Sequence, residues 1–508
     1  MGEYKTPGVY IKEKNAFGNS VVEVETAIPV FIGLTEKAQD GTTSLLNKPM
    51  RISSMTEFNN YFGGAPTPKF TLSIEEIKGD DESNYLICLP DKKKEKALKV
   101  KSPDTIYTLY YHMVLFFANG GGTCYVVSIG DYQTGSLDKS IIKDSVFPEL
   151  KKVQDITMLV VPEALQVTDW KDIYTNLLGL CDSKKYFVLL DVPMKGDEEE
   201  KDPATCFRNK IGSNNLQFAA AYYPWLETSV LSDNDITQDN IKWKEPPTLL
   251  SPFFNWTPPK EGDVFPLDKY VSGLLTRKKE LKNDNAVKEI DKELHNALLQ
   301  NWPEYSLMVK KVKDHLNLLP PSAAMAGIYT MVDNTRGVWK APANVSVNYV
   351  NKPAIPITNA DQEELNMPMS GKAINAIRSF PGEGIKVWGA RTLDGNSQDW
   401  RYINVRRTMT FLEQSVKNAA RAYVFEPNDA NTWINMKCMI ESFLRSVWKR
   451  GGLAGATPED AYSVHVGLGD TMTPEDILEG IMRITVLVAI SHPAEFIEIT
   501  FQQQMQKS

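Results

Sequence analysis

The clearest fold signal in this chain is ITMLVVPEALQVTDWKDIYTNLLGLCDSKKYFVLLDVP, from Ile156 to Pro193. It reads as a strand (Ile156 to Glu163), a helix (Asp169 to Ser183) and a second strand (Tyr186 to Pro193). Both strands are continuous apolar runs, which is typical of strands that are buried on both faces of a sheet. Such strands alternating with helices predict a doubly wound α/β layer with a largely parallel sheet.

The same alternation continues on both sides of this stretch. Ala27 to Ala38 (AIPVFIGLTEKA) reads as a buried strand that leaves into a loop. Tyr107 to Ala118 reads as an apolar helix, and the glycines of NGGG at Asn119 to Gly122 end it. Cys124 to Gly130 is a further buried strand, and Phe218 to Leu226 continues the apolar pattern. The α/β layer therefore extends well beyond residues 156–193.

Two segments interrupt this pattern. Residues 65–105 are polar and contain DKKKEK, which predicts a surface excursion. Residues 230–318 contain a proline-rich loop and a charged helical stretch, which predicts an insertion in the α/β domain. A compact pattern resumes at residues 320–344.

Composition limits the classes of function. The 508 residues are 42% hydrophobic and 24% charged, and the formal net charge is -8, so we expect no general nucleic-acid binding. The longest apolar runs are too short to span a bilayer, which needs about 20 apolar residues, so we expect no membrane insertion. The five cysteines are scattered and the start lacks a signal-peptide pattern, which predicts a protein made in a reducing cytoplasm.

The last quarter of the chain is mostly helical. Asn431 to Arg450 predicts an amphipathic helix because its apolar side chains recur at helical spacing; they are Trp433, Met436, Ile440, Phe443 and Val447. Thr473, followed by proline and two acids, predicts a second helix start.

Both chain ends alternate like strands. At the C-terminus Ile497, Ile499 and Phe501 face one way, and Glu498, Thr500 and Gln502 face the other. Near the N-terminus Val9 and Ile11 alternate with Tyr10 and Lys12, and Val21 to Glu25 predicts a second strand. The C-terminal strand has no partner left to follow it in the sequence.

No motif predicts a cofactor, a metal site or a catalytic site. The five histidines lie far apart in sequence, no glycine-rich segment fits the P-loop spacing, and G-x-S-x-G is absent. Four arginines (Arg391, Arg401, Arg406 and Arg407) form a local basic cluster, for which salt bridges within the domain and contact with an acidic patch of another subunit both stay open. The acids Glu475, Asp476 and Glu479 are read as helix N-terminal residues, with a basic partner surface as the alternative.

Several segments together resemble contractile tail sheath proteins. They include TPGVY at Thr6 to Tyr10, the α/β segments above, Leu319 to Asn344, VWGARTLDGNSQDWRYINVRRTMTFLEQS at Val387 to Ser415, AYVFEPNDANTW at Ala422 to Trp433, and HPAEFIEITF at His492 to Phe501. Their joint presence in this order, over most of the chain, makes the resemblance specific. It implies a structural, non-enzymatic subunit that polymerises helically around an inner tube and contracts to drive the tube through a target envelope.

The resemblance also implies an organisation. It consists of an N-terminal linking arm (residues 1–26), an α/β outer domain (27–345) and an α+β C-terminal inner domain (346–508) with strand-donating ends. Strands from the two ends of one subunit would add to a sheet of another. The linking residues expected are Val9, Tyr10, Ile11, Val22, Val24, Phe496, Ile497, Glu498, Ile499, Thr500 and Phe501. The tube-facing candidates are Lys437, Glu441, Arg445, Glu475, Asp476 and Glu479.

The partners implied are further copies of the chain, the inner tube protein, and baseplate and terminal cap proteins. Assembly would take place in the bacterial cytoplasm, and the phage tail or phage-tail-like particle would be released by lysis. A hydrolase on an α/β fold is the alternative from another class, and it requires a nucleophile, a base and an acid within hydrogen-bond reach in a pocket. A secreted adhesive protein is a third alternative, against which the missing signal peptide speaks.

Overall fold

The computed structural model describes residues 21–76, 85–90, 96–133, 135–243, 273–274, 276–278, 280 and 284–499. The chain divides into two compact units. Among described residues, the C-terminal unit contains 21–26, 333–341 and 402–499, and the α/β unit contains the rest. The mixed α/β, multidomain class predicted from the sequence is confirmed.

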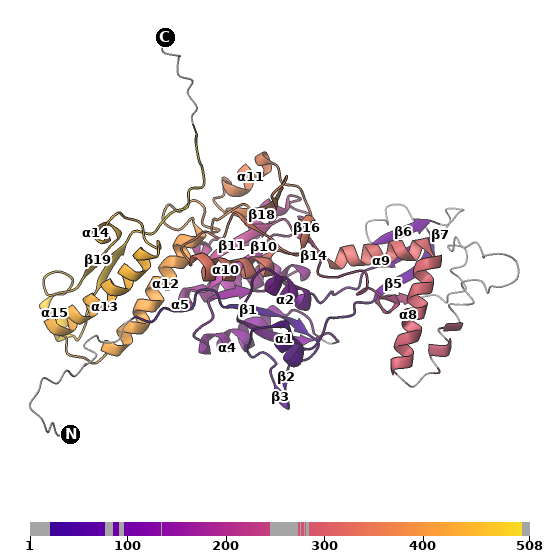
Figure 1. Cartoon of the computed structure of the whole chain (residues 1–508), viewed down its shortest axis with the longest axis horizontal. Coiled ribbons are helices and arrows are strands. Elements are labelled where there is room, and N and C mark those ends of the chain that lie inside the picture. The colour runs from indigo at the N-terminus through magenta and orange to yellow at the C-terminus, as the bar shows by residue number, and fades with distance from the viewer. Residues whose placement is uncertain are drawn as a thin grey trace, which may run out of the picture. The chain divides into compact units, whose positions relative to one another are not determined.

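A nine-stranded sheet forms the centre of the α/β unit (Figure 1). Its central strands pair in parallel and the two ends of the sheet carry antiparallel strands, so the sheet is largely parallel, as predicted. The order is β15 (Val345–Ser346), β18 (Gly384–Val387), β17 (Ile374–Phe380), β11 (Ala219–Tyr223), β10 (Phe187–Asp191), β9 (Met158–Val160), β1 (Pro29–Thr35), β8 (Cys124–Asp131) and β4 (Met50–Ile52).

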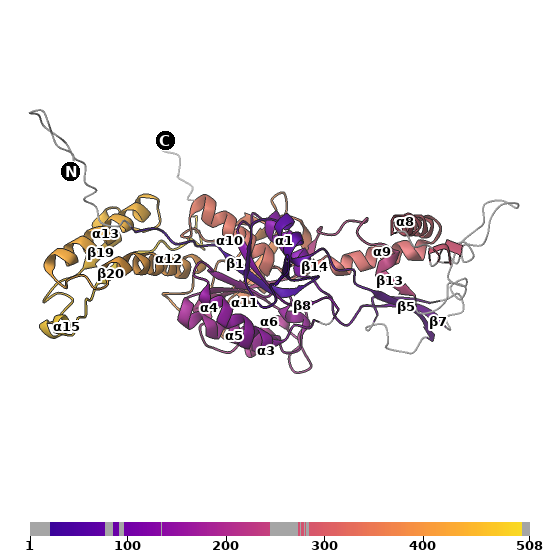
Figure 2. The same ribbon diagram turned by 90° about the horizontal axis from the view of Figure 1, so that it is seen from below.

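Helices cover both faces of this sheet (Figure 2). On one face lie α1 (Met55–Phe62) and α10 (Ser322–Arg336). Helix α2 (Leu109–Ala118) lies on the same face, because it packs closely against Gly327 of α10. Here Phe31 meets Phe116 edge to face at 4.9 Å, and the Tyr222 and Tyr329 hydroxyls lie 2.8 Å apart. On the other face lie α3 (Lys139–Ile141), the π-helical turn η2 (Ile142–Val146), α4 (Phe147–Lys152), α5 (Trp170–Lys184) and α6 (Pro203–Lys210).

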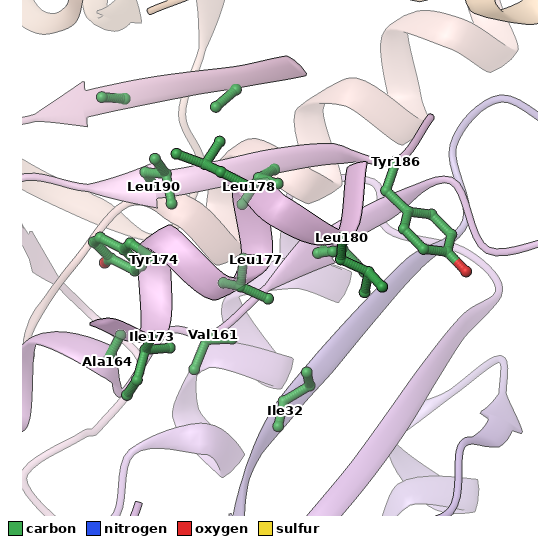
Figure 3. Packing of buried hydrophobic residues seen from close by; sticks show 14 of the residues in the cluster. Ile32, Val161, Ala164, Ile173, Tyr174, Leu177, Leu178, Leu180, Tyr186 and Leu190 are labelled. Carbon is green, nitrogen blue, oxygen red and sulfur yellow. The ribbon is translucent and has the colours of Figure 1, made fainter. Parts of the chain in front are cut away.

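The core between α5 and the sheet explains why residues 156–193 form a strand, a helix and a strand (Figure 3). Ile173 and Leu177 of α5 are fully buried and share one cluster with Ile32 of β1 and Leu190 of β10. Each such side chain contributes about 1.5–3 kcal/mol when it leaves water. The strands must therefore be apolar on both faces, and their continuous apolar runs follow from that requirement.

Glu163, which follows β9, holds the start of α2 in place. Its buried carboxylate accepts the backbone N–H groups of Thr108 (2.6 Å), Leu109 (3.1 Å) and Leu34 (3.0 Å). Burial raises the pKa of Glu163 to about 6, although these hydrogen bonds act to lower it. Position 33 is glycine because a Cβ there would lie 2.5 Å from Glu163 Oε2.

Asp191, at the end of the neighbouring strand β10, has the same role for another helix. Its carboxylate accepts the backbone N–H of Ser322 at 2.8 Å, where α10 begins. Burial raises the pKa of Asp191 to about 7. Acids at the carboxyl ends of two adjacent strands thus cap two helices of the same face.

The two predicted interruptions form one small sheet. β13 (Ile241–Trp243) of the insertion pairs in parallel with β5 (Phe70–Glu76) of the polar excursion. β7 (Lys96–Lys101) and β6 (Ile87–Pro90) complete the order β13-β5-β7-β6. The prediction of a surface excursion at residues 65–105 missed these strands, because their pairing across the sequence is long-range.

Two helices of the insertion belong with this small sheet (Figure 1). They are α8 (Asp284–Asn301) and α9 (Pro303–Leu316), joined by the fully buried Trp302. His315 of α9 meets Phe70 of β5 edge to face at 6.0 Å. The remaining short elements of the α/β unit are β2 (Gln39–Asp40), β3 (Thr43–Ser44), β12 (Leu226–Thr228), β14 (Leu318–Leu319), β16 (Val350–Pro353), α11 (Asn359–Asn366) and the single 3-10 turns η3 (Ala164–Gln166), η4 (Leu216–Phe218) and η5 (Gln238–Asn240).

The C-terminal unit combines helices with a two-stranded sheet (Figure 1). Phe411 and Phe443 meet edge to face at 5.9 Å in its core. The predicted helix 431–450 is present as α13, which Asp429 caps by accepting the Thr432 N–H at 3.0 Å. Its elements are α12 (Ile403–Ala420), η7 (Arg421–Tyr423), α13 (Ala430–Lys449), α14 (Pro458–Ala461), β19 (Tyr462–His465), α15 (Pro474–Leu478) and β20 (Thr485–Val488).

The expected boundary at residue 345 differs from the division in the structure. Residues 342–401 belong to the α/β unit, because β17 pairs with β11 and β18 pairs with β17. The C-terminal unit instead takes residues 333–341 from the end of α10 onward.

Candidate inter-subunit linkage surface

The sheet of the C-terminal unit has open edges. β19 and β20 pair antiparallel over four residues each, and within the described chain no third strand joins them. The Ala489 N–H donates to the Ala461 carbonyl at 2.8 Å. In an antiparallel ladder every second pair of residues is hydrogen-bonded, so the next such pair is Ser463 with Leu487. The backbone groups of Val486, between such positions, therefore point away from β19.

One face of this sheet is packed and the other is free. Val464 is buried with Ile440 and Leu444 of α13, and Val486 packs against the same cluster. Leu487, which points to the opposite face, is 57% exposed. The sheet thus offers a continuous apolar face over α13 that a further strand could extend.

The C-terminal segment leaves this sheet through a set of fixed contacts. The Ala489 carbonyl accepts the Ala454 N–H at 2.8 Å, and the Ser491 carbonyl accepts Asn404 Nδ2 at 3.0 Å. The Tyr402 hydroxyl donates to Glu495 Oε2 at 3.2 Å. The segment is therefore attached to its own unit as far as Glu495.

Residues 496–499 are exposed and form no strand. Phe496, Ile497 and Ile499 are 73%, 77% and 69% exposed, and Glu498 is exposed as well. The expectation of a terminal strand is not met in the single chain, because no ladder partner is present at residues 492–499. Thr500 and Phe501 lie outside the described residues.

The N-terminal linking residues fall into two groups. Val9, Tyr10 and Ile11 lie outside the described residues. Val22 is 77% exposed, whereas Val24 is half-buried and its N–H donates to Ser415 Oγ at 3.2 Å. The strand predicted at Val21 to Glu25 is not formed; these residues lie against their own C-terminal unit instead.

The predicted arginine cluster is not one surface patch. Arg406 contacts Glu413 at 3.2 Å, and Arg407 forms a buried two-pronged pair with Asp333 at 3.0 and 2.6 Å. Arg391 and Arg401 belong to the α/β unit, where they bond to backbone carbonyls. For Arg406 and Arg407, salt bridging within the domain is the interpretation that the structure supports. Asp333 was missed because it lies 74 residues from Arg407 in sequence.

The tube-facing candidates lie on two elements. Lys437, Glu441 and Arg445 form one stripe along the outer side of α13, and Lys437 lies 3.9 Å from Glu441. Glu475 of α15 is exposed. Glu479 is exposed as well, but it follows the last residue of α15, so its interpretation as a helix N-terminal residue is wrong.

Asp476 of α15 is already engaged. Its carboxylate accepts Arg483 Nη2 at 3.0 Å and the Thr473 N–H at 3.0 Å. Hydrogen bonds from Arg483 hold the pKa of Asp476 below its usual range. The capping role predicted as one alternative for this acid is therefore present.

The histidines form no catalytic set in the described part of the chain. Ser102 Oγ lies 3.4 Å from His315 Nε2, and the same ring meets Phe70 edge to face, but among the described residues no acid bonds to it. His295 meets the Tyr305 hydroxyl, and His465 meets Asp470 at 3.5 Å. In the same residues no three His, Cys, Asp or Glu side chains gather as metal ligands, and no helix is long and apolar enough to cross a membrane.

The known proteins that this chain resembles are sheath proteins. Residues 396–504 match the family described as the phage tail sheath C-terminal domain. The chain also resembles the sheath complex of an extracellular contractile injection system, PVC, in its contracted state, with 28% identity and a TM-score of 0.59 over 99% of each chain. The contracted helical sheath of the anti-feeding prophage (AFP) gives 27% identity and a TM-score of 0.60, over 99% of this chain and 100% of that one.

Curated relatives agree over a shorter stretch. The tail sheath protein of Vibrio phage KVP40 is 25% identical over 178 residues, which are 34% of this chain and 25% of that protein. That of Enterobacteria phage T4 is 26% identical over 146 residues, 28% of this chain and 22% of that protein. The chain thus spans about a quarter of the length of these relatives. The predicted resemblance to the contractile tail sheath family is confirmed, and the relatives are structural sheath proteins of phage tails and injection particles.

Proposed function

We propose that this chain is a structural subunit of a contractile sheath, which polymerises helically around an inner tube and contracts to drive the tube through a target envelope. The observation that carries the proposal is the pairing of an open-edged sheet, β19–β20, with a C-terminal segment whose apolar side chains are exposed. Each feature is a liability in a monomer, and each is satisfied by a neighbouring copy.

Strand addition between copies explains both features. Residues 496–501 of one copy, and residues around Val9 to Ile11 of another, extend the sheet of a third. Ile497 and Ile499 then lie on the apolar face that Val464 and Val486 begin. A strand of four residues adds about four backbone hydrogen bonds at roughly 0.5–1.5 kcal/mol each.

The sheath contacts its other partners through different surfaces. The stripe of Lys437, Glu441 and Arg445 on α13, with Glu475, Asp476 and Glu479 on and beside α15, faces the inner tube. Polar and charged contacts suit an interface that must release during contraction. The ends of the sheath bind baseplate and terminal cap proteins, in keeping with the similarity to a protein from the AFP baseplate.

No cofactor, nucleotide or nucleic acid enters this mechanism. The work comes from many small gains at subunit interfaces when the rigid units rotate and pack. We propose that the sheath is made and assembled in the bacterial cytoplasm and leaves by lysis as part of a phage tail or a tail-like particle. The hydrolase alternative gains no support from the Ser102–His315 contact, which joins no acid in the described residues.

Two truncations and one substitution test strand addition. Deleting Phe496–Ser508 retains the Tyr402–Glu495 contact, and deleting Met1–Ser20 retains the N-terminal contacts at residues 21–26. Both variants should remain folded and soluble by circular dichroism but form no tubes in negative-stain microscopy. Val486→Pro should likewise stay folded and form no tubes, because it removes an N–H that points to the open edge.

The matched control is Leu487→Pro, which removes an N–H from the β19–β20 ladder and should destabilise the unit itself. Normal tubes from either truncation would refute strand donation by that end of the chain. Normal tubes from Val486→Pro would exclude the open edge of β20 as the acceptor.

A further inference from the structure

We infer that residues 21–26 are an intramolecular anchor, which stays bound to the C-terminal unit of its own chain while the sheath assembles and contracts. The N-terminal strand that is donated to a neighbour is therefore drawn from residues before Val21, and Val22 and Val24 are not part of it. This inference rests on the proposed function, because it states which part of the arm is shared between copies.

Three ties hold the segment along its length. The Arg450 guanidinium binds the Glu23 carboxylate with both terminal nitrogens, one of them at 3.2 Å. The Val24 N–H donates to Ser415 Oγ, and the Thr26 carbonyl accepts Arg407 Nη2 at 2.9 Å. Two of these contacts come from α12 and the third from Arg450, which directly follows α13, so the segment runs along α12 of its own unit.

Of the three contacts, the hydrogen bond from Arg407 to the Thr26 carbonyl involves the most deeply buried side chain. Arg407 and Asp333 are paired at 3.0 and 2.6 Å, and their side chains are 4% and 1% exposed. Nη2 of the same Arg407 side chain also donates to the Thr26 carbonyl at 2.9 Å. A charge-assisted bond from a side chain that is already fixed loses little entropy on forming, so it favours the docked segment.

The Arg450 guanidinium that binds Glu23 is also held in position by its own unit. The Arg450 guanidinium lies over the Trp339 ring, 5.2 Å from its centre, so a cation–π contact helps to hold the arginine in place. Gly452 permits this packing, because a Cβ there would lie 2.9 Å from the same ring.

The exposure pattern of the segment does not fit a donated strand. Val21, Val24 and Thr26 are half-buried, while Val22, Glu23 and Glu25 are exposed. Val21 and Val24 both pack against the core of the unit. A donated strand requires alternation with a period of two, in which Val22 and Val24 share one face. Here they do not, because Val24 is half-buried whereas Val22 is exposed, and the half-buried positions are 21, 24 and 26.

An engineered disulfide between Val24→Cys and Ser415→Cys tests the anchor. The two residues are hydrogen-bonded at 3.2 Å between Val24 N and Ser415 Oγ, and serine to cysteine is nearly isosteric. The exposed Cys438 and half-exposed Cys88 are first replaced by serine. The full chain is produced with the tube and baseplate proteins of its own particle, and each single-cysteine variant serves as control.

The disulfide should form in oxidant, and the particles should assemble and contract to the same lengths with and without reductant. Oxidised particles that fail to assemble, or to shorten, until reductant is added would show that the segment leaves its unit. Failure of the two cysteines to couple would also overturn the inference. If the unmodified chain forms no tubes at all, the proposed function fails instead.

Hydrogen exchange of the unmodified chain gives an independent reading that needs no substitution. The amides of residues 21–26 should have the same protection in the unassembled chain and in the sheath. A change in protection of tenfold or more at Val24 upon assembly would contradict an anchor that persists.

Discussion

The buried pair of Arg407 and Asp333 should dominate the stability of the C-terminal unit. Arg407→Met leaves a carboxylate that is 1% exposed without its two-pronged partner. Uncompensated buried charges of this kind cost about 3–5 kcal/mol. The Thr26 carbonyl also loses a donor, which adds roughly 1 kcal/mol. We therefore expect about 4–6 kcal/mol of destabilisation from this single substitution.

Removing both charges should cost far less. In Arg407→Met with Asp333→Leu, apolar side chains of similar size replace the pair, and such replacements are often neutral or stabilising. The remaining loss is the bond to Thr26, roughly 1 kcal/mol. The double variant should thus recover most of the stability that the single variant loses, which gives a coupling energy of about 3 kcal/mol or more.

Guanidinium unfolding of the full chain measures these changes, with hydrogen exchange of α12 peptides reporting on the C-terminal unit. Local readout is needed because a chain of two units does not unfold in one step. The free energy of unfolding could fall by less than 1 kcal/mol in the single variant, or by the same amount in the single and double variants. Either result would refute the view that the two buried charges stabilise the unit only as a pair.

Two further predictions concern Glu163 and the tube-facing stripe. Because burial raises the pKa of Glu163 from 4.5 to about 6, its protonated form favours folding, and this contribution is complete below pH 4.5 and lost as pH rises through 6. The unfolding free energy of the native chain relative to Glu163→Gln should fall by about 2 kcal/mol across that range and then level off; a flat difference in urea titrations would refute this. Reversing the charges of Lys437 and Arg445 to Glu should leave sheaths that form but lack tube in electron micrographs, whereas Lys417→Glu on α12 serves as a control; normally filled sheaths would exclude the α13 stripe as the tube contact.

The α/β layer could be predicted from sequence because its strands are buried on both faces. Such strands need apolar residues at successive positions, and the helices between them need an apolar stripe, so the pattern is local. The predicted helix at Tyr107 to Ala118 and strand at Cys124 to Gly130 are present as α2 and β8. The predicted stop of the first helix is confirmed, because α2 ends at Ala118.

Long-range pairings were not predictable in the same way. β17 pairs with β11 across about 150 residues, and β13 pairs with β5 across about 170, so neither the boundary at residue 401 nor the small sheet has a local signal. The proposed anchor at residues 21–26 likewise depends on a pair that lies far apart in sequence, Arg407 and Asp333. Their residue types could suggest a pair, but nothing in a single sequence selects these partners among the other charges.

Under the proposed function, strands from two other chains would complete the sheet of the C-terminal unit. An isolated two-stranded sheet is marginal in water, and here α13 stabilises it by covering Val464 and Val486 on one face. If a strand is added at each edge, about eight further backbone bonds would contribute on the order of 4–12 kcal/mol per subunit before the cost of ordering the donated residues, which is roughly 1–2 kcal/mol each. The two quantities nearly cancel, so backbone bonding alone would not hold a lattice together. Burial of apolar side chains such as Ile497 and Ile499, 77% and 69% exposed in the single chain, would have to supply the difference at about 1.5–3 kcal/mol each. The alternation of apolar residues at the C-terminus is thus what would make strand exchange favourable, and the anchor at residues 21–26 would reduce its cost by leaving fewer residues to order.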